Sequence, residues 1–304
     1  MQRYIVHRFL QGIVALLVIS IIVFTLSRLT GNPLDLLIPE DAPAALRERM
    51  AANLGLDKPL PVQYFNFIRN MAQGDFGESI VYRESCLFLF LQRLPNSLSL
   101  IIPSFILAFL VGIPLGVLAA INRGKLFGYV CEAVAVIGIA VPHFWLALVL
   151  MMTFSSLLGI LPAARMGGPD HYVLPVASMS LYLLAGIMRL IRSAMLDALG
   201  SEYVKLARIK GLSEFKVIIG HCLRNSLIPA VSFSGMYFAR LIAGTIVIEM
   251  IFAWPGTGRL LYQGIMNRDY PLIQSVIILK AALILSVTLV VDIAYAYLDP
   301  RIRY

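Results

Sequence analysis

The sequence predicts an all-α membrane protein with six transmembrane helices and a large outer loop after the first of them. The chain of 304 residues is 59% hydrophobic and only 14% charged. Average soluble domains hold about 45–50% apolar and about 25% charged residues. The mean hydropathy is +0.83. Six apolar stretches are each long enough to cross the hydrocarbon layer of a bilayer, which takes about 20 helical residues.

The predicted spans divide the chain into a first transmembrane helix (1–29), an outer loop (30–96) and a five-helix membrane domain (97–304). The spans themselves are 9–29, 97–121, 130–158, 172–190, 226–251 and 272–298. The first is too long for the apolar core of a signal peptide, and no Ala-x-Ala cleavage site follows it, so it is predicted to be retained. The third contains Pro142, which favours a kink or a break in the helix.

Basic residues predict the orientation of the chain. Arg3 and Arg8 precede the first span, Arg123 and Lys125 follow the second, and the loop 193–225 is rich in lysine and arginine. Because short cytoplasmic loops carry the excess of positive charge, both termini and this loop are predicted to be cytoplasmic. The net charge of +8 is therefore attributed to contact with the lipid bilayer, and no nucleic-acid partner is expected.

The outer loop is long enough to form structure of its own. Asp41 is suited to cap a helix over 44–53, with Pro43 near its first turn. A second helix is predicted over 62–71, and the motif QGDFGES (73–79) is typical of a turn. This loop is expected to cap the membrane helices, to form a platform for an external protein, or both.

The sequence shows no motif that would support catalysis. No P-loop is present, because Gly256–Arg259 lacks the lysine of that motif. The histidines show no metal-binding spacing and the cysteines no CxxC pair, which disfavours a metal site or a disulfide framework. The histidines are His7, His143, His171 and His221, and the cysteines are Cys86, Cys131 and Cys222. An intramembrane enzyme or a secondary transporter stays an alternative, but neither a convergent catalytic set nor an internal repeat is evident.

The loop between the fourth and fifth spans contains a short predicted helix. Residues 202–210 are helix formers, and Gly211 is a natural stop for a helix. Val204, Ala207 and Arg208 fall on one face at i, i+3 and i+4. A small, partly apolar helix outside the bilayer is suited to docking into another protein.

This loop resembles the EAA loop of ABC importer permeases. The matching residues are Glu202, Ala207 and Gly211, followed by the pair Ile228-Pro229. The literal Glu-Ala-Ala triplet is absent, because Tyr203 and Val204 follow the glutamate. Further similarity to the dipeptide, oligopeptide and nickel permease branch covers nearly the whole chain. It includes QGDFGESI (73–80), IVIEMIFAWPGTGRLL (246–261), NRDYPLIQ (267–274) and LDPRIRY (298–304).

The resemblance implies a binding-protein-dependent permease subunit in the bacterial plasma (inner) membrane. It implies a second homologous permease, an external substrate-binding protein and two cytoplasmic ATPase subunits that bind ATP and Mg²⁺. The chain itself would then hold no catalytic residue and no cofactor. Glu202, Ala207, Arg208 and Gly211 would belong to the ATPase coupling helix. Di- or oligopeptides are the first expectation for the substrate, and nickel, a metal chelate or glutathione are the alternatives.

Polar residues inside the predicted spans are candidates for a translocation path. Arg240 and Lys280 either line such a path or form structural ion pairs, because a charge in the bilayer costs roughly 2.5–3.5 kcal/mol on insertion scales. Glu249 and Asp292 lie near span ends and are expected to be structural. His143 follows Pro142 and either contacts the substrate, with a nickel ligand as one form of that role, or is a satisfied core histidine.

Overall fold

The structure, a computed structural model, describes residues 2–30, 43–53 and 57–298. These residues are helical apart from turns and one isolated β-bridge between Glu78 and Ser85. The chain forms two compact units. The first unit contains Leu98–Trp254 and the end of the last helix. The second unit contains the described parts of Gln2–Ser97 together with Pro255–Leu289.

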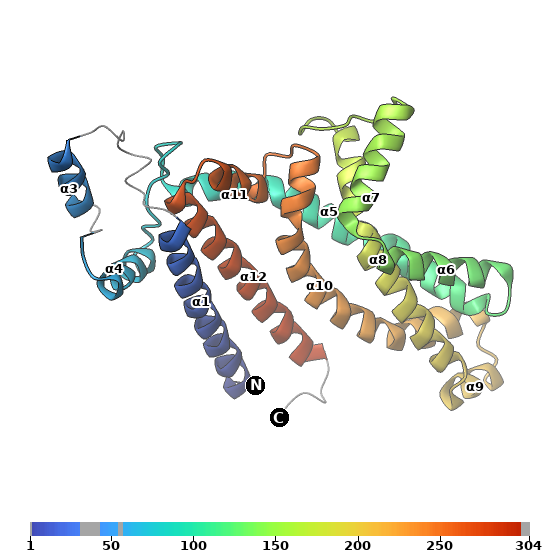
Figure 1. Cartoon of the computed structure of the whole chain (residues 1–304). Helices are drawn as coiled ribbons and strands as arrows, with labels where there is room; N and C mark the ends of the chain where they lie inside the picture. The colour runs from blue at the N-terminus through green and yellow to red at the C-terminus, as the bar shows by residue number, and fades with distance from the viewer. Residues whose placement is uncertain (1, 31–42, 54–56, 299–304) are drawn as a thin grey trace. The chain divides into compact units, whose positions relative to one another are not determined.

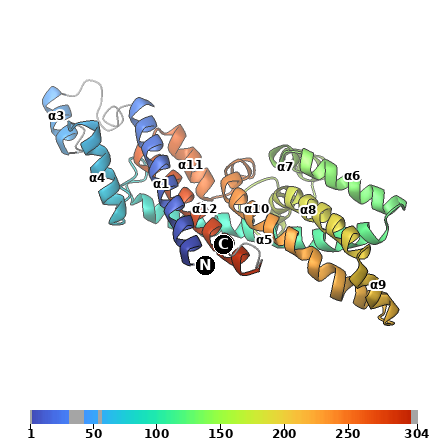
Figure 2. The same ribbon diagram turned by 90° about the horizontal axis from the view of Figure 1, so that it is seen from below.

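The second unit contains two long apolar helices, α1 (Gln2–Thr30) and most of α12 (Tyr270–Leu298), which run alongside each other in both views (Figures 1 and 2). The short helix α4 (Leu60–Ala72) packs on α1. Its Tyr64 hydroxyl lies 2.8 Å from Ser20 Oγ. The centroid of the Phe24 ring lies 5.5 Å from that of Tyr64 and 5.6 Å from that of Phe67. Aromatic side chains of α4 therefore cover part of the first span.

The two helices predicted in the outer loop are present. Helix α3 extends over Ala44–Asn53, as predicted, and α4 extends slightly beyond its predicted range at both ends. The proposed cap Asp41 lies outside the described residues. The turn predicted at 73–79 is also confirmed, with Gly74 at φ +83° and Gly77 at φ +78°.

Two helices that lie wholly or partly in this unit differ from expectation. Helix α5 (Cys86–Ile121) begins at Cys86, well before the predicted start of the second span at residue 97. Helix α11 (Thr257–Met266) lies between the last two spans and was not predicted. It is fixed to the start of α5, since Ser97 Oγ lies 3.0 Å from Thr257 Oγ1 and also accepts the Thr257 N–H.

The first unit is built around α8 (Asp170–Leu199), the most buried of the candidate membrane spans. Three helices pack against it: α6 (Leu126–Ala140), α7 (His143–Leu150) and α10 (Arg224–Ile251). Gly112 and Gly116 of α5 also contact α8. A Cβ atom on Gly116 would come within 2.8 Å of both Ile191 Cβ and the Met188 carbonyl. Small residues thus allow the close helix packing typical of membrane bundles.

Five helices are long and apolar enough to cross a membrane, among the residues that the structure describes, and a sixth span results if one bent pair is counted. That pair is Leu126–Ala140 with His143–Leu157, and the two parts meet at 105°. The break predicted at Pro142 is confirmed. The α6 part has 15 residues and is about 22 Å long at 1.5 Å per residue, too short to cross a core of about 30 Å alone.

Candidate functional site

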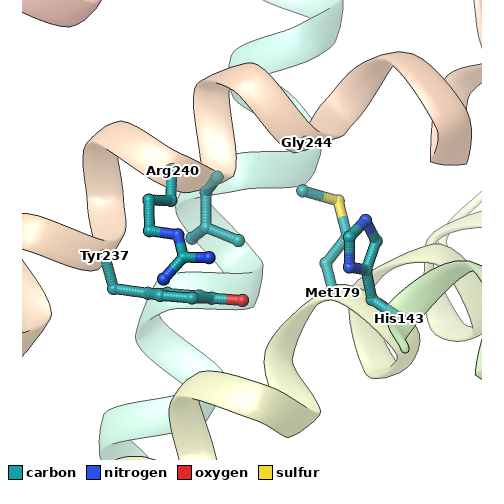
Figure 3. A pocket seen from close by; sticks show the side chains of 6 residues that line it. His143, Met179, Tyr237, Arg240 and Gly244 are labelled. Carbon is teal, nitrogen blue, oxygen red and sulfur yellow. The ribbon is translucent and has the colours of Figure 1, made fainter. Parts of the chain in front are cut away.

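A pocket of about 320 Å³ lies at the break between α6 and α7 in the first unit. The break contributes backbone and side chains, α8 contributes one residue, and one face of α10 contributes three. The lining residues are Ile139, Ala140, Val141, Pro142, His143, Tyr182, Tyr237, Arg240 and Gly244. A smaller cavity of about 20 Å³ shares four of these residues and adds Met179 and Leu241 (Figure 3). Non-helical backbone at membrane depth is tolerated where it lines such a cavity.

One wall of the pocket is aromatic. The rings of Tyr182 on α8 and Tyr237 on α10 are stacked, with centroids 4.8 Å apart and planes 12° from parallel. Phe233 continues the stack, with its ring 6.1 Å from Tyr237. Tyr237 is buried, so its phenol ring presents a fixed surface to the pocket.

Arg240 lies one helical turn beyond Tyr237. Its guanidinium carbon is 5.9 Å from the centroid of the Tyr237 ring, within the range of a cation–π contact. In Figure 3 the guanidinium lies over that ring, and His143 and Met179 stand across the pocket from them. Within the described parts of the chain, no carboxylate pairs with Arg240. Its five N–H donors are therefore available to a solute in the pocket.

His143 is the first residue of α7, and Pro142 before it provides no side-chain cap. The histidine faces α10 closely: a Cβ atom placed on Gly244 would lie 3.6 Å from His143 Nε2. Glycine at this position leaves the space between the two elements open. The structure thus brings two of the predicted path residues, His143 and Arg240, to one pocket. Lys280 is a buried residue of α12 in the other compact unit.

On α8 and α10, the pocket residues Tyr182, Tyr237 and Gly244 were not singled out from the sequence. Tyr237, Arg240 and Gly244 follow one another at i, i+3 and i+7, which is the spacing of a single helix face. That spacing could have indicated Tyr237 and Gly244 once Arg240 was selected. Tyr182 carries no comparable signal, because its place opposite Tyr237 depends on how α8 packs against α10.

The predicted coupling helix is α9 (Glu202–Ile209), and its end has the geometry of a Schellman motif. The Leu212 N–H donates to the Ala207 carbonyl at 3.3 Å, and the Gly211 N–H donates to the Arg208 carbonyl at 2.9 Å. Gly211 has φ +79°, a conformation that favours glycine. The expected helix stop is therefore present at Gly211.

Helix α9 has a buried side and an exposed side. Val204 and Ala207 are buried, so they belong to the inner face that supports the helix. The side chains of Tyr203, Leu206 and Ile209 are exposed instead. Arg208 Nε donates to Glu214 Oε1 at 2.8 Å, and this hydrogen bond raises the pKa of the Arg208 guanidinium. Val204 and Ala207 therefore form the buried side of α9, and the exposed side carries an apolar stripe beside the charged residues Glu202, Lys205 and Arg208.

A multi-pass helical bundle with a pocket at a broken span, and a small helix in a basic loop, defines a membrane transport subunit. The chain belongs to the family described as "Binding-protein-dependent transport system inner membrane component", which it matches over residues 112–304. The N-terminal domain of the same family matches residues 1–101. The predicted family is confirmed, and the chain is a permease of the ABC importer type.

Full-length relatives support this assignment. The chain is 38% identical over 319 aligned residues to the oligopeptide transport system permease protein AppB of Bacillus subtilis (strain 168). It is 38% identical over 305 aligned residues to the glutathione transport system permease protein GsiC of Escherichia coli (strain K12). In both comparisons the alignment covers all of this chain and all of the relative.

Solved structures confirm the predicted fold class. An inward-facing structure of the MetNI methionine ABC transporter matches 70% of this chain and 97% of its own, with a TM-score of 0.58 and 16% identity. An amino acid ABC transporter matches with a TM-score of 0.52 and 16% identity, covering 70% of this chain and 94% of that chain. The bundle is therefore of the ABC importer permease type.

Proposed function

We propose that this chain is the permease subunit of an ATP-driven importer of di- or oligopeptides. The observation that carries the proposal is its full-length similarity to an oligopeptide permease and a glutathione permease. Glutathione is itself a small peptide, so both relatives' names refer to peptide cargo. Import of nickel or a metal chelate stays the alternative within the same branch.

Energy would reach this chain through α9. The exposed side of the helix carries an apolar stripe beside its charged residues, and the side chains of Leu206 and Ile209 in this stripe are exposed to 55% and 82%. Such a face suits a hydrophobic cleft on a cytoplasmic ATPase. Two ATPase subunits would bind ATP and Mg²⁺, and the permease would hold neither. The Schellman end at Gly211 would fix the direction of the helix, so that movement of the ATPase pair shifts the attached spans.

The remaining partners follow from the same proposal. A second, homologous permease subunit would complete the translocation path. An external substrate-binding protein would deliver the peptide, and the outer region around α3 and α4 is the proposed platform for it. Both termini and the α9 loop would lie in the cytoplasm, with the chain in the bacterial plasma membrane, as the distribution of basic residues predicts.

Uptake by the complete transporter tests the proposed substrate. The complex would be reconstituted in liposomes with its own binding protein, and ATP-dependent uptake of a radiolabelled dipeptide, a pentapeptide, glutathione and nickel ion would be compared. We expect uptake of at least one peptide and none without ATP. Uptake of nickel ion alone would replace the proposed substrate with the metal alternative.

A further inference from the structure

We propose that the pocket at the α6–α7 break recognises a carboxylate group of the transported solute. This inference rests on the proposed peptide function, because a peptide ends in an α-carboxylate. Its basis is that Arg240 and His143 face one pocket whose remaining wall is aromatic and apolar. No negatively charged residue is among those that line it.

Arg240 is the principal binding group. Arginine stays charged under all ordinary conditions, and its planar fork of donors matches the geometry of a carboxylate. An arginine in a membrane-spanning helix is costly and marks a functional site unless a partner neutralises it. Within the residues that the structure describes, Arg240 contacts an aromatic ring and no carboxylate. A solute with a negative charge would supply the missing counter-ion.

The start of α7 reinforces the same preference. The first N–H groups of a helix carry its positive dipole end. No side chain caps α7, and Val141, Pro142 and His143 at its start line the pocket. The helix end and the guanidinium thus present positive charge to one space. Half-helix N-termini that point at anionic groups are a recurring device in membrane transport proteins.

The pocket also suits the rest of a small peptide. Ligand sites hold about 300–1,000 Å³, so a volume of about 320 Å³ accommodates one end of a short peptide. The stacked Tyr182 and Tyr237 rings form an apolar surface beside the charged group. The carboxylate would bind at Arg240, and the adjoining side chain would lie against the rings.

A peptide with a free C-terminal carboxylate and the same peptide with a C-terminal amide provide the transport test. In the reconstituted complex, Arg240→Met is expected to reduce uptake of the free acid by about tenfold or more, with little change for the amide. Arg224→Met is the matched control, because Arg224 is an exposed residue at the start of the same helix. Since the binding protein is the same throughout, a changed acid-to-amide ratio reports on the permease alone.

Equal losses of acid and amide uptake in Arg240→Met would overturn the proposal. That result would assign Arg240 to a structural contact, such as a carboxylate of the second permease subunit. If Arg240→Met does not assemble, Arg240→Lys keeps the charge but loses the fork of donors. It should lower the acid-to-amide ratio less than Arg240→Gln does, and an unchanged ratio in both variants would contradict carboxylate binding.

A second measurement does not depend on peptide transport. A cysteine can replace Gly244 without a clash, because its Cβ atom would lie 3.6 Å from His143 Nε2 and 3.9 Å from Cε1, which are ordinary contact distances. In a background without Cys86, Cys131 and Cys222, Gly244→Cys would be treated with an anionic and a cationic methanethiosulfonate. Arg240 should raise the ratio of anionic to cationic reaction rates by about tenfold relative to Arg240→Met. If the wild-type complex transports no peptide, the peptide function fails and this ratio alone decides whether the site binds anions. An equal ratio of anionic to cationic reaction rates with and without Arg240 would refute anion binding at this site.

Discussion

The Ser79 hydroxyl donates a hydrogen bond of 2.5 Å to Asp269 Oδ2, across 190 positions of sequence. The same carboxylate oxygen accepts the Val81 N–H at 3.1 Å, and Oδ1 accepts the Leu272 N–H at 3.2 Å. Since α12 begins at Tyr270, Asp269 is its N-cap and Leu272 is the third residue of the helix. One buried carboxylate therefore caps the last span and fixes the turn that precedes α5.

Asp269→Ala is expected to destabilise the second unit. It removes an N-cap, worth about 1 kcal/mol, and leaves buried donors without their acceptor, at a further cost of about 1–3 kcal/mol. The measurement is thermal unfolding of the purified subunit in detergent. Ser79→Ala is the comparison variant, because it removes the hydroxyl that donates to Asp269 and accepts the Tyr82 N–H but leaves the helix cap in place. An Asp269→Ala melting temperature as high as that of Ser79→Ala would contradict this account.

The sequence predicted what depends on local pattern. Apolar length indicated the spans, Pro142 indicated the break, and Asp41 with Pro43 indicated α3 with the bounds observed. It did not predict that α5 begins at Cys86, because Arg93 and Pro95 lower the hydropathy of its first turns. Pairings such as Ser79 with Asp269, or Tyr182 with Tyr237, depend on how distant segments pack. No local signal encodes them.

The helix stop at Gly211 gives a second prediction, for coupling. Gly211 has φ +79°, and a Cβ atom placed on it would have no neighbouring atom within 4 Å, so a substitution meets backbone strain and no clash. Gly211→Val should impair the end of α9 and reduce ATP-dependent uptake, while membrane insertion stays normal. Gly211→Asn should be milder, because asparagine enters this conformation more readily. Uptake and membrane content are measured together, and equal uptake by both variants would argue against a role for the left-handed backbone.

The two faces of α9 predict opposite phenotypes. Ile209→Glu changes the exposed face, so the subunit should stay stable but recover less ATPase on purification. Val204→Ala changes a fully buried residue, and should lower the free energy of unfolding by about 0.5–3 kcal/mol. Thermal unfolding and co-purification of the ATPase separate the two effects. Normal ATPase recovery with Ile209→Glu would place the docking surface elsewhere.

Accessible cysteines test the predicted orientation. Glu84 and Ser213 are both exposed, whereas Ser79 is buried and hydrogen-bonded and is unsuited to labelling. In a background without the native cysteines, Glu84→Cys should react with an impermeant thiol reagent from outside. Ser213→Cys should react only after the membrane is opened. Labelling of both positions from the outside would show that the two loops share one side and would overturn the proposed orientation.

Lys280 provides a contrast to Arg240. It lies ten residues beyond Tyr270, or about 15 Å along α12 at 1.5 Å per residue, and is only 5% exposed. A lysine held this closely inside its unit is expected to stabilise the protein more than to contact a passing solute. Lys280→Met, which keeps an unbranched side chain, should lower the yield of the subunit and reduce uptake of a free-acid peptide and its amide alike. The ratio of the two rates, normalised to protein content, should equal that of the wild type. A ratio that falls as it does in Arg240→Met would assign Lys280 to the translocation path.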